Sequence, residues 1–359
     1  MKLEDNIRKI IMQIPSYEGV DPSLKLAAES GIKPENIIKL NANENPFGDS
    51  LGLGKNLSDI NIHEYPDPNQ KLLRESLADY TGNKFDQLVA GSGSDELIDI
   101  LIRIFLNEGD KLIDAKPTFG MYEFFAKIQG AEVISVPRDK EFNIDLSMIL
   151  DQIDEKTKMI FLASPNNPTG NLASLNEIKT LLETNLIVVV DETYFEFSKF
   201  SYSNLIEDYE NLIILRSFSK WAGLAGLRIG YAISNSKLIE KILLVKQPYN
   251  INSAAEHVAI KAMKNKDDLL LKVRTLIEQK DKIYKFLTKY DSVTPYPSSA
   301  NFILCDFLRI DVNDVFEKLA KNGIFVRKFS DKNIKNSLRI SAGTPDQTRK
   351  LLRVLETII

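Results

Sequence analysis

Residues Arg216 to Tyr231 read R-S-F-S-K-W-A-G-L-A-G-L-R-I-G-Y. This stretch places two hydroxyls, Ser217 and Ser219, one lysine, Lys220, and one arginine, Arg228, within 12 consecutive residues. Hydroxyls and a guanidinium suit a phosphate monoester, and a neighbouring amine can attack an aldehyde. Lysine beside phosphate anchors is the chemistry of a pyridoxal phosphate enzyme, in which the lysine forms a Schiff base. Taken alone, the stretch also fits two strands joined by a polar turn that carries a solvated lysine.

The composition describes an ordinary globular protein. The chain has 359 residues, of which 43% are hydrophobic and 27% charged, so we expect two domains. Its net charge of -4 argues against a nucleic-acid partner, which usually leaves a basic footprint. The single cysteine, Cys305, lies in an apolar run and is predicted to be a buried strand residue. Two isolated histidines, His63 and His257, give no reason to expect a metal site.

No apolar run approaches the length of a membrane span, and the N-terminal residues M-K-L-E-D-N-I-R-K-I contain no apolar core of a secretory signal. We therefore expect no membrane partner and a cytoplasmic location.

Short β-like runs alternate with amphipathic segments between residues 87 and 233. The expected strands are residues 87–90, 111–114, 132–136, 159–163, 186–190, 212–215 and 229–233. The expected helices are residues 94–106, 122–129, 146–153 and 175–183, with Ser94 and Ser174 as N-caps. This alternation predicts an α/β domain whose central sheet is mainly parallel and covered by helices on both faces.

The pattern changes after about residue 252. Long helical stretches at 254–263 and 267–290 precede strands at 301–306, 325–329 and 337–340 and helices at 312–321 and 345–356. This is an α+β pattern. We therefore expect an N-terminal arm (1–38) that packs with the small domain and the substrate site, a large cofactor-binding domain (39–252) and a small C-terminal domain (253–359).

Four motifs follow predicted strands, where open α/β sheets gather their ligands. A-G-S-G-S-D-E (Ala90 to Glu96) is a glycine-rich turn that enters a helix, and its backbone N–H groups suit a phosphate. S-P-N-N-P-T-G (Ser164 to Gly170) is a rigid turn in which Asn167 can present its amide to a ring oxygen. Each of these motifs alone also fits a simple turn.

The third motif, V-V-V-D-E-T-Y (Val188 to Tyr194), ends a buried strand with the carboxylate of Asp191. A buried carboxylate requires a partner, and a protonated pyridine nitrogen would supply one. Tyr194 could donate to the phenolate oxygen of the same ring. Fourth, Arg327 and Arg339 lie on two predicted strands of the small domain, and each offers a planar fork for carboxylate or phosphate. A helix-capping Asp or a strand-end salt bridge is the alternative for Asp191, and solvated side chains on edge strands are the alternative for the two arginines.

In this order the motifs resemble the fold-type I pyridoxal phosphate-dependent aminotransferases over essentially the full chain, and within them the histidinol-phosphate aminotransferases. The residues that carry the resemblance also include L-N-A-N-E-N-P-F-G (Leu40 to Gly48) and Y-P-D-P (Tyr65 to Pro68). The resemblance implies a homodimer with shared active sites, in which Tyr65 of one subunit reaches the cofactor phosphate of the other.

The resemblance assigns a role to each matching residue. Lys220 would carry the Schiff base and exchange the proton, Asp191 would pair with the pyridine nitrogen, and Tyr194 would contact the phenolate oxygen. The remaining cofactor contacts would be the phosphate-binding Gly93, Ser94, Asp95, Ser217, Ser219 and Arg228, the ring-stacking Phe119, and Asn167 on the phenolate oxygen. The amine substrate would meet Tyr17, Asn45, Arg327 and Arg339.

The implied reaction is a ping-pong transamination through an aldimine. L-histidinol phosphate and 2-oxoglutarate would give imidazole-acetol phosphate and L-glutamate, a step of histidine biosynthesis. Three alternatives stay open on the same scaffold: an aromatic amino-acid aminotransferase, a threonine-phosphate decarboxylase and a catalytically silent binding protein. The intact set of Lys220, Asp191 and Asn167 argues against the last of these.

Overall fold

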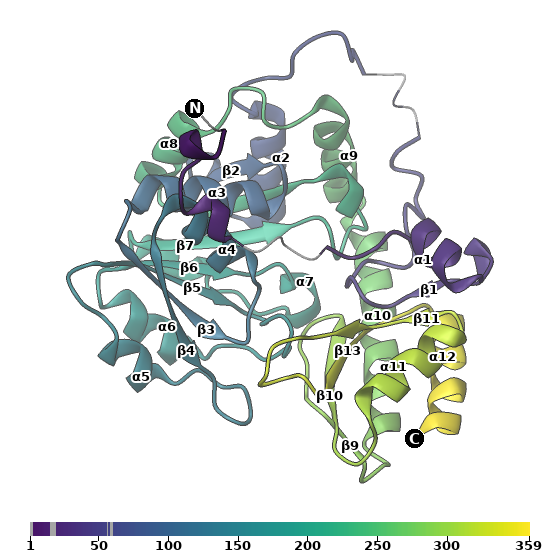
Figure 1. The fold of residues 1–359 in the computed structure, drawn as a ribbon. Helices are drawn as coiled ribbons and strands as arrows, with labels where there is room; N and C mark the ends of the chain where they lie inside the picture. Colours follow the sequence, from purple (N-terminus) through teal and green to yellow (C-terminus); the bar gives the residue numbers. More distant parts are fainter. Residues whose placement is uncertain (1–2, 15–18, 56, 58–59) are drawn as a thin grey trace.

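The computed structural model describes residues 3–14, 19–55, 57 and 60–359, and its largest element is a seven-stranded sheet (Figure 1). In spatial order its strands are β2 (Leu88–Gly91), β8 (Gly230–Ser234), β7 (Leu212–Ser217), β6 (Ile187–Asp191), β5 (Thr157–Ala163), β3 (Lys111–Lys116) and β4 (Glu132–Pro137). Strand β8 runs antiparallel to both of its neighbours, and the pairs from β7 to β4 are parallel. The predicted mainly parallel sheet is therefore confirmed.

Both faces of this sheet are buried, which explains why its central strands lack polar alternation. Side chains of successive strand residues point to opposite faces. Accordingly Val188 and Val190 of β6 belong to one hydrophobic core and Val189 to the other. Helices α3 (Gly93–Phe105), α4 (Met121–Gln129) and α8 (Ser236–Val245) cover the second face. Helices α2 (Lys71–Thr81), α5 (Leu146–Asp151), α6 (Leu175–Leu182) and α9 (Ser253–Lys264) pack on the first.

The two predicted N-caps have different outcomes. Ser174 caps α6 in a capping box with Glu177, as expected. The prediction for Ser94 is wrong, because α3 begins at Gly93 and Ser94 lies inside its first turn. Here the carboxylate of Glu96 accepts a hydrogen bond of 2.5 Å from the backbone N–H of Ser92, so an acidic side chain closes the helix start.

The C-terminal part contains a four-stranded antiparallel sheet in the order β12 (Arg327–Lys328), β13 (Ser337–Ser341), β10 (Phe302–Phe307) and β9 (Val293–Pro295). Helices α10 (Lys266–Leu287), α11 (Val312–Lys321) and α12 (Pro345–Ile358) pack against it, forming the α+β arrangement expected (Figure 1). Cys305 on β10 is buried, as predicted.

The single strand expected at 325–329 is wrong, because the chain changes sheets there. Strand β11 (Ile324–Phe325) pairs in parallel with β1 (Ile38–Lys39), whereas β12 pairs with β13. The reason is tertiary: the segment after α1 (Ser23–Ser30) supplies β1 as a neighbouring strand, and β11 pairs with it. This pairing joins the N-terminal region to the small domain.

The three-part domain division stays a prediction. Helix α9, assigned in advance to the small domain, buries Ala255, Val258 and Ala259 in the core of the large sheet. Helix α10 contributes to that core near its start and, through Ile283 and Leu287, to the small-domain core near its end. We propose that the transition between the two domains lies within α10. Among the helices of the described residues, none has the length and apolarity needed to cross a membrane.

Candidate active site

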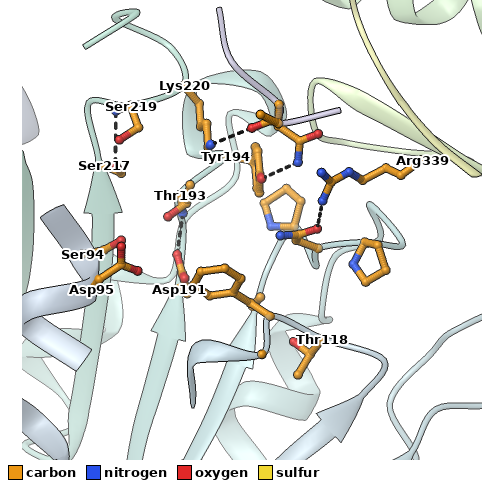
Figure 2. A pocket seen from close by; sticks show the side chains of 18 of the residues that line it. Ser94, Asp95, Thr118, Asp191, Thr193, Tyr194, Ser217, Ser219, Lys220 and Arg339 are labelled. Carbon is orange, nitrogen blue, oxygen red and sulfur yellow. Dashed lines mark hydrogen bonds between the residues drawn. The ribbon is translucent and has the colours of Figure 1, made fainter. Parts of the chain in front are cut away.

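A cavity of about 380 Å³ opens at the carboxyl ends of β5, β6 and β7, the edge where parallel sheets collect ligands (Figure 2). Residues from the large sheet line one side, and Arg327, Phe329 and Arg339 of the small domain line the other. The sequence-predicted residues that line it are Ser94, Asp95, Phe119, Asn167, Asp191, Tyr194, Ser217, Ser219, Lys220, Arg228, Arg327 and Arg339. Segments more than 200 residues apart in sequence therefore converge on one cavity.

Lys220 follows the end of β7 and extends its amine into the cavity (Figure 2). Its Nζ donates to the carbonyl oxygen of Ala42 at 3.2 Å. Burial, and then the positive charge of Arg339, lower the pKa of Lys220 to about 8. Near neutral pH a useful fraction of this amine is therefore unprotonated, which a nucleophile or general base requires.

Asp191 is the last residue of β6 and is buried at the base of the cavity. Its Oδ2 accepts from the hydroxyl of Tyr122 at 2.8 Å, and its Oδ1 accepts from the backbone N–H of Thr193 at 2.9 Å. Burial raises the pKa of this carboxyl group. The described residues provide it with no ion pair, so a ligand that brings a cationic N–H would complete its environment.

Donors for an anion gather beside the start of α3. Ser217 and Ser219 lie at the end of β7, where the N–H of Ser219 donates to Ser217 Oγ at 3.1 Å. Arg228 spans the opposite side and donates to Asp95 Oδ2 at 2.7 Å. Gly93 has a φ of +78°, a conformation that favours glycine, and a Cβ there would also displace the guanidinium of Arg228. Hydroxyls, a guanidinium and a helix N-terminus together suit a phosphate group.

The small domain reaches into the cavity through Arg339. Its Nη1 donates to Asn167 Oδ1 at 2.5 Å, and its Nη2 donates to the carbonyl oxygen of Asn41 at 2.7 Å. Arg327 faces Arg339 across the β12–β13 pair, so both guanidiniums belong to the same face of that sheet. Two adjacent arginines at the cavity mouth are suited to bind an anionic substrate.

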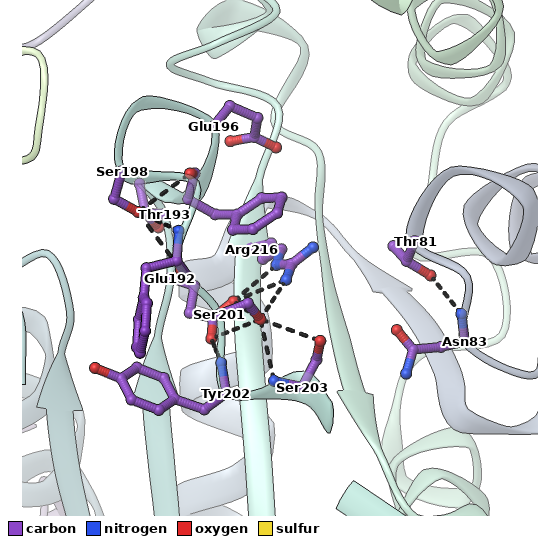
Figure 3. Close-up of polar contacts among 12 residues, drawn as sticks. Thr81, Asn83, Glu192, Thr193, Glu196, Ser198, Ser201, Tyr202, Ser203 and Arg216 are labelled. Carbon is purple, nitrogen blue, oxygen red and sulfur yellow. Dashed lines mark hydrogen bonds and ion pairs between the residues drawn. The ribbon is translucent and has the colours of Figure 1, made fainter. Parts of the chain in front are cut away.

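Directly behind the cavity, Glu192 and Arg216 form a buried ion pair with N–O distances of 3.0 and 2.9 Å (Figure 3). Glu192 follows Asp191 and Arg216 precedes Ser217, so the pair links the ends of β6 and β7 on the side away from the cavity. The backbone N–H of Tyr202 and the hydroxyl of Ser201 also donate to Glu192. This network fixes the two strand ends that carry the cavity residues.

The family model described as "Aminotransferase class I and II" matches residues 35–355, which is most of the chain. The chain belongs to the class I and II aminotransferases. A histidinol-phosphate aminotransferase of Dehalococcoides mccartyi is 41% identical over 320 residues, covering 89% of each chain. The chloroplastic histidinol-phosphate aminotransferase 1 of Arabidopsis thaliana is 40% identical over 354 residues, covering 98% of this chain and 85% of the relative.

The fold of this aminotransferase also matches a solved structure. The histidinol-phosphate aminotransferase of Sinorhizobium meliloti, solved in complex with pyridoxal-5'-phosphate, superimposes with a TM-score of 0.88 at 22% identity. The match covers 99% of this chain and 98% of the other. The expected fold of type I, an α/β large domain with a smaller α+β domain, is thereby confirmed.

Some predicted site residues do not line the cavity of this aminotransferase. Asn45 uses its amide within the chain: Nδ2 donates to the carbonyl oxygen of Trp221 at 3.0 Å, and Oδ1 accepts from the N–H of Phe47. Tyr65 is 81% exposed and stacks on Tyr249 with ring centroids 4.5 Å apart. Tyr17 lies outside the described residues. Gly93 does not line the cavity either, although it stands beside Arg228. The cofactor and substrate roles of all the predicted site residues stay predictions.

Sequence reasoning missed several residues that line the cavity. Tyr122, which donates to Asp191, stands three residues after Phe119 in the run F-G-M-Y and could have been recognised there. Asn43 stands two residues before Asn45 in the same L-N-A-N-E-N-P motif. Ala42 and Thr193 also line the cavity and lie inside the motifs L-N-A-N-E-N-P-F-G and V-V-V-D-E-T-Y, and Thr118 directly precedes Phe119.

Proposed function

We propose that this aminotransferase binds pyridoxal 5'-phosphate through Lys220 and transfers an amino group between L-histidinol phosphate and 2-oxoglutarate. The observation that carries the proposal is the pairing of two groups in one cavity. Lys220 offers an amine whose pKa is lowered to about 8, and Asp191 offers a buried carboxyl group that forms no ion pair with the residues the structure describes. A cofactor with an aldehyde and a protonated ring nitrogen suits both.

The surrounding residues fit the remaining groups of the cofactor. Its phosphate would lie among the two serines, the start of α3 and Arg228, as expected from the motifs. Its ring would lie against Phe119, which lines the cavity and packs edge-to-face on Tyr122 at 5.6 Å. Asn167 and Tyr194 would meet the ring oxygen from the opposite side.

When bound, pyridoxal phosphate supplies an electron sink for charge that develops on the reacting carbon of the substrate. The chain's own residues carry out the rest. Tyr122 and Thr193 hold the carboxylate of Asp191 in place, where it would keep the ring nitrogen of the cofactor protonated. Lys220 would take the proton from the substrate carbon and deliver it to the carbon of the cofactor that carried the aldehyde, so that the amino group can leave the substrate. Its low pKa suits this exchange near neutral pH.

The choice of substrate rests on the relatives and on the two arginines. Relatives about 40% identical over most of the chain bear the name histidinol-phosphate aminotransferase. Arg327 and Arg339 can bind the phosphate of L-histidinol phosphate in one half-reaction and a carboxylate of 2-oxoglutarate in the other. The products would be imidazole-acetol phosphate and L-glutamate, within histidine biosynthesis.

The cofactor assignment can be tested by borohydride reduction of the purified holoenzyme. Reduction fixes the cofactor on the lysine to which it is bound, and peptide mass spectrometry should then locate the added mass on Lys220. Lys220→Ala should lose both the modified peptide and the near-visible absorption band. Labelling of a different lysine would overturn the assignment.

The substrate can be tested with a panel of amines added to the holoenzyme. Rapid loss of the absorption band with L-histidinol phosphate, and slow loss with phenylalanine or tyrosine, is the expected result. A band that responds only to the aromatic amino acids would replace the proposal with an aromatic aminotransferase. Release of carbon dioxide from threonine phosphate would replace it with a decarboxylase.

We further propose that the protein acts as a homodimer. Tyr65 is exposed, as are two nearby large apolar side chains. Ile62 lies three residues before Tyr65 in the sequence, and Tyr249 stacks on the ring of Tyr65. A partner subunit that covers them could receive Tyr65 at its cofactor phosphate. Mixing inactive Tyr65→Ala and Lys220→Ala chains should restore activity, because one of the two hybrid sites is then intact. If activity is not restored, Tyr65 has no role in the active site of the partner subunit.

The cytoplasmic location stays a prediction.

A further inference from the structure

Three consecutive residues, Asn41 to Asn43, each contact a different functional side chain of the cavity. The carbonyl oxygen of Asn41 accepts from Arg339 at 2.7 Å, and that of Ala42 accepts from Lys220 at 3.2 Å. Asn43 Nδ2 donates to the hydroxyl of Tyr194 at 2.9 Å, one of the dashed lines in Figure 2. Only this third contact is made by a side chain, so only this one can be altered by substitution without moving the backbone.

Asn43 is 2% exposed and held on several sides. Its backbone N–H donates to Ser341 Oγ at 3.0 Å, and Ser341 Oγ donates in turn to Asn43 Oδ1 at 2.9 Å. Asn301 Nδ2 donates to the carbonyl oxygen of Asn43 at 3.0 Å. With Oδ1 engaged by Ser341, Nδ2 is the amide atom that faces Tyr194.

These contacts form a directional chain. The hydroxyl of Ser341 donates to the amide of Asn43, and that amide donates to the hydroxyl of Tyr194. Because Tyr194 Oη accepts on the Asn43 side, its own proton points elsewhere. Tyr194 lines the cavity, so an oxygen of a bound ligand is available to receive that proton.

We propose that Asn43 is a positioning residue that fixes the direction in which Tyr194 donates its hydrogen bond. The inference rests on the proposed function, since the acceptor is the ring oxygen of the bound cofactor. Ser341 and Arg339 are two residues apart on β13 and therefore share a face. The chain of donors thus starts on the strand that carries an anion-binding arginine and ends at the cofactor.

The decisive variant is Asn43→Asp, which keeps the size of the side chain and reverses the hydrogen bond. A carboxylate accepts from Tyr194, so the tyrosine proton turns away from the cofactor. The readout is the pH midpoint of the absorption band of lysine-bound cofactor in the holoenzyme. Loss of a donor to the ring oxygen should shift that midpoint by about one pH unit. Tyr194→Phe should give the same shift, and the double variant should add nothing to it.

A second variant keeps the test decisive if the Asn43→Asp protein does not fold or if its new carboxyl group stays protonated. The φ of Asn43 is 54°, which glycine adopts without strain, so Asn43→Gly removes the side chain and preserves the backbone. It should shift the midpoint in the same direction and lower kcat with little change in KM. An unchanged midpoint in both Asn43→Asp and Asn43→Gly would overturn the proposal.

Asn301→Ala is the matched control, because it removes a hydrogen bond to the backbone of Asn43 and leaves the amide side chain in place. Its midpoint should equal that of the wild type. A shift as large as that of Asn43→Asp would mean that the midpoint responds to any weakening of the contacts around Asn43, and not to the direction of the hydrogen bond to Tyr194. Failure of the proposed function is distinguishable, since borohydride would then label no lysine or a lysine other than Lys220 in the wild-type protein.

Discussion

Asp191 and Glu192 are consecutive buried carboxyl groups at the end of β6, yet their surroundings differ (Figures 2 and 3). Burial raises the pKa of both. Glu192 is paired with Arg216 and receives further hydrogen bonds from Ser201 and the backbone of Tyr202. Asp191 receives two hydrogen bonds and, among the described residues, no cation.

The difference separates a charge that the fold pairs internally from one that, under the proposed function, a ligand would pair. Leaving a buried charge without a counter-ion costs free energy, and Glu192 shows how the fold avoids that cost. The fold accepts the cost at Asp191, on the side of the sheet that faces the cavity. A carboxylate kept incomplete in this way favours a ligand that brings the missing positive charge.

The largest effect on stability is expected from Glu192→Gln. The substitution leaves Arg216 buried without its closest counter-ion and should lower the free energy of unfolding by about 3–5 kcal/mol. Urea denaturation measures this loss. Glu210→Gln, which breaks the exposed pair with Lys237, is the control and should cost less than about 1 kcal/mol. Equal losses in the two variants would contradict the structural role of Glu192.

Asp191→Asn should have the opposite effect: a large loss of activity and no loss of stability. Loss of the carboxylate should lower kcat/KM by about 10²–10³-fold, since the charge on the ring nitrogen is no longer supported. The cofactor-free protein should be as stable as wild type or more so, because the substitution removes a buried carboxyl group that has no counter-ion among the described residues. Steady-state kinetics and urea denaturation test the two halves. A large loss of stability with little loss of activity would refute the comparison.

Lys220 adds a pH dependence to the cavity side. In the cofactor-free fold its pKa is about 8, below the ordinary value of 10.5, so the unfolded chain binds more protons between these limits. Stability should therefore rise with pH across that window, by up to about 1.4 kcal/mol per pH unit. Lys220→Met should not show this rise when both proteins are denatured between pH 7 and 10. Parallel curves for the two would exclude the lowered pKa.

The smallest effect is expected from Tyr80→Phe, on the structural side. Tyr80 donates to Glu196 at 2.9 Å, and burial raises the pKa of Glu196 to about 7. Between pH 4.5 and about 7 the folded protein binds more protons at Glu196 than the unfolded chain does. The contribution of Glu196 to the free energy of unfolding therefore falls as the pH rises. Removing the donor should cost about 1 kcal/mol at pH 6 and about 2 kcal/mol at pH 8. Denaturation at the two pH values measures the difference. A loss that is independent of pH would mean that Glu196 does not titrate there.

The local sequence was sufficient wherever a motif follows a buried strand. Lys220, Asp191 and Asn167 were predicted to meet, and each lines the cavity, because parallel strands end at one edge. The local sequence was insufficient where a side chain or strand contacts a residue that is distant in the sequence. The contact of Asn43 with Tyr194 spans 151 residues, and no local period marks it. The division of residues 324–328 between two sheets depends likewise on pairing with distant β1 and β13.

The sequence by itself determined the mainly parallel sheet and the order of the motifs along its edge, and it named the lysine and the carboxylate. These are properties of short segments, set by hydrophobic runs and turn residues. Only the tertiary structure decided which of two adjacent carboxylates is paired, how low the pKa of Lys220 falls and which asparagine meets Tyr194. Desolvation and hydrogen-bond direction depend on every neighbour in space, and the neighbours of Asp191, Lys220 and Tyr194 come from across the chain.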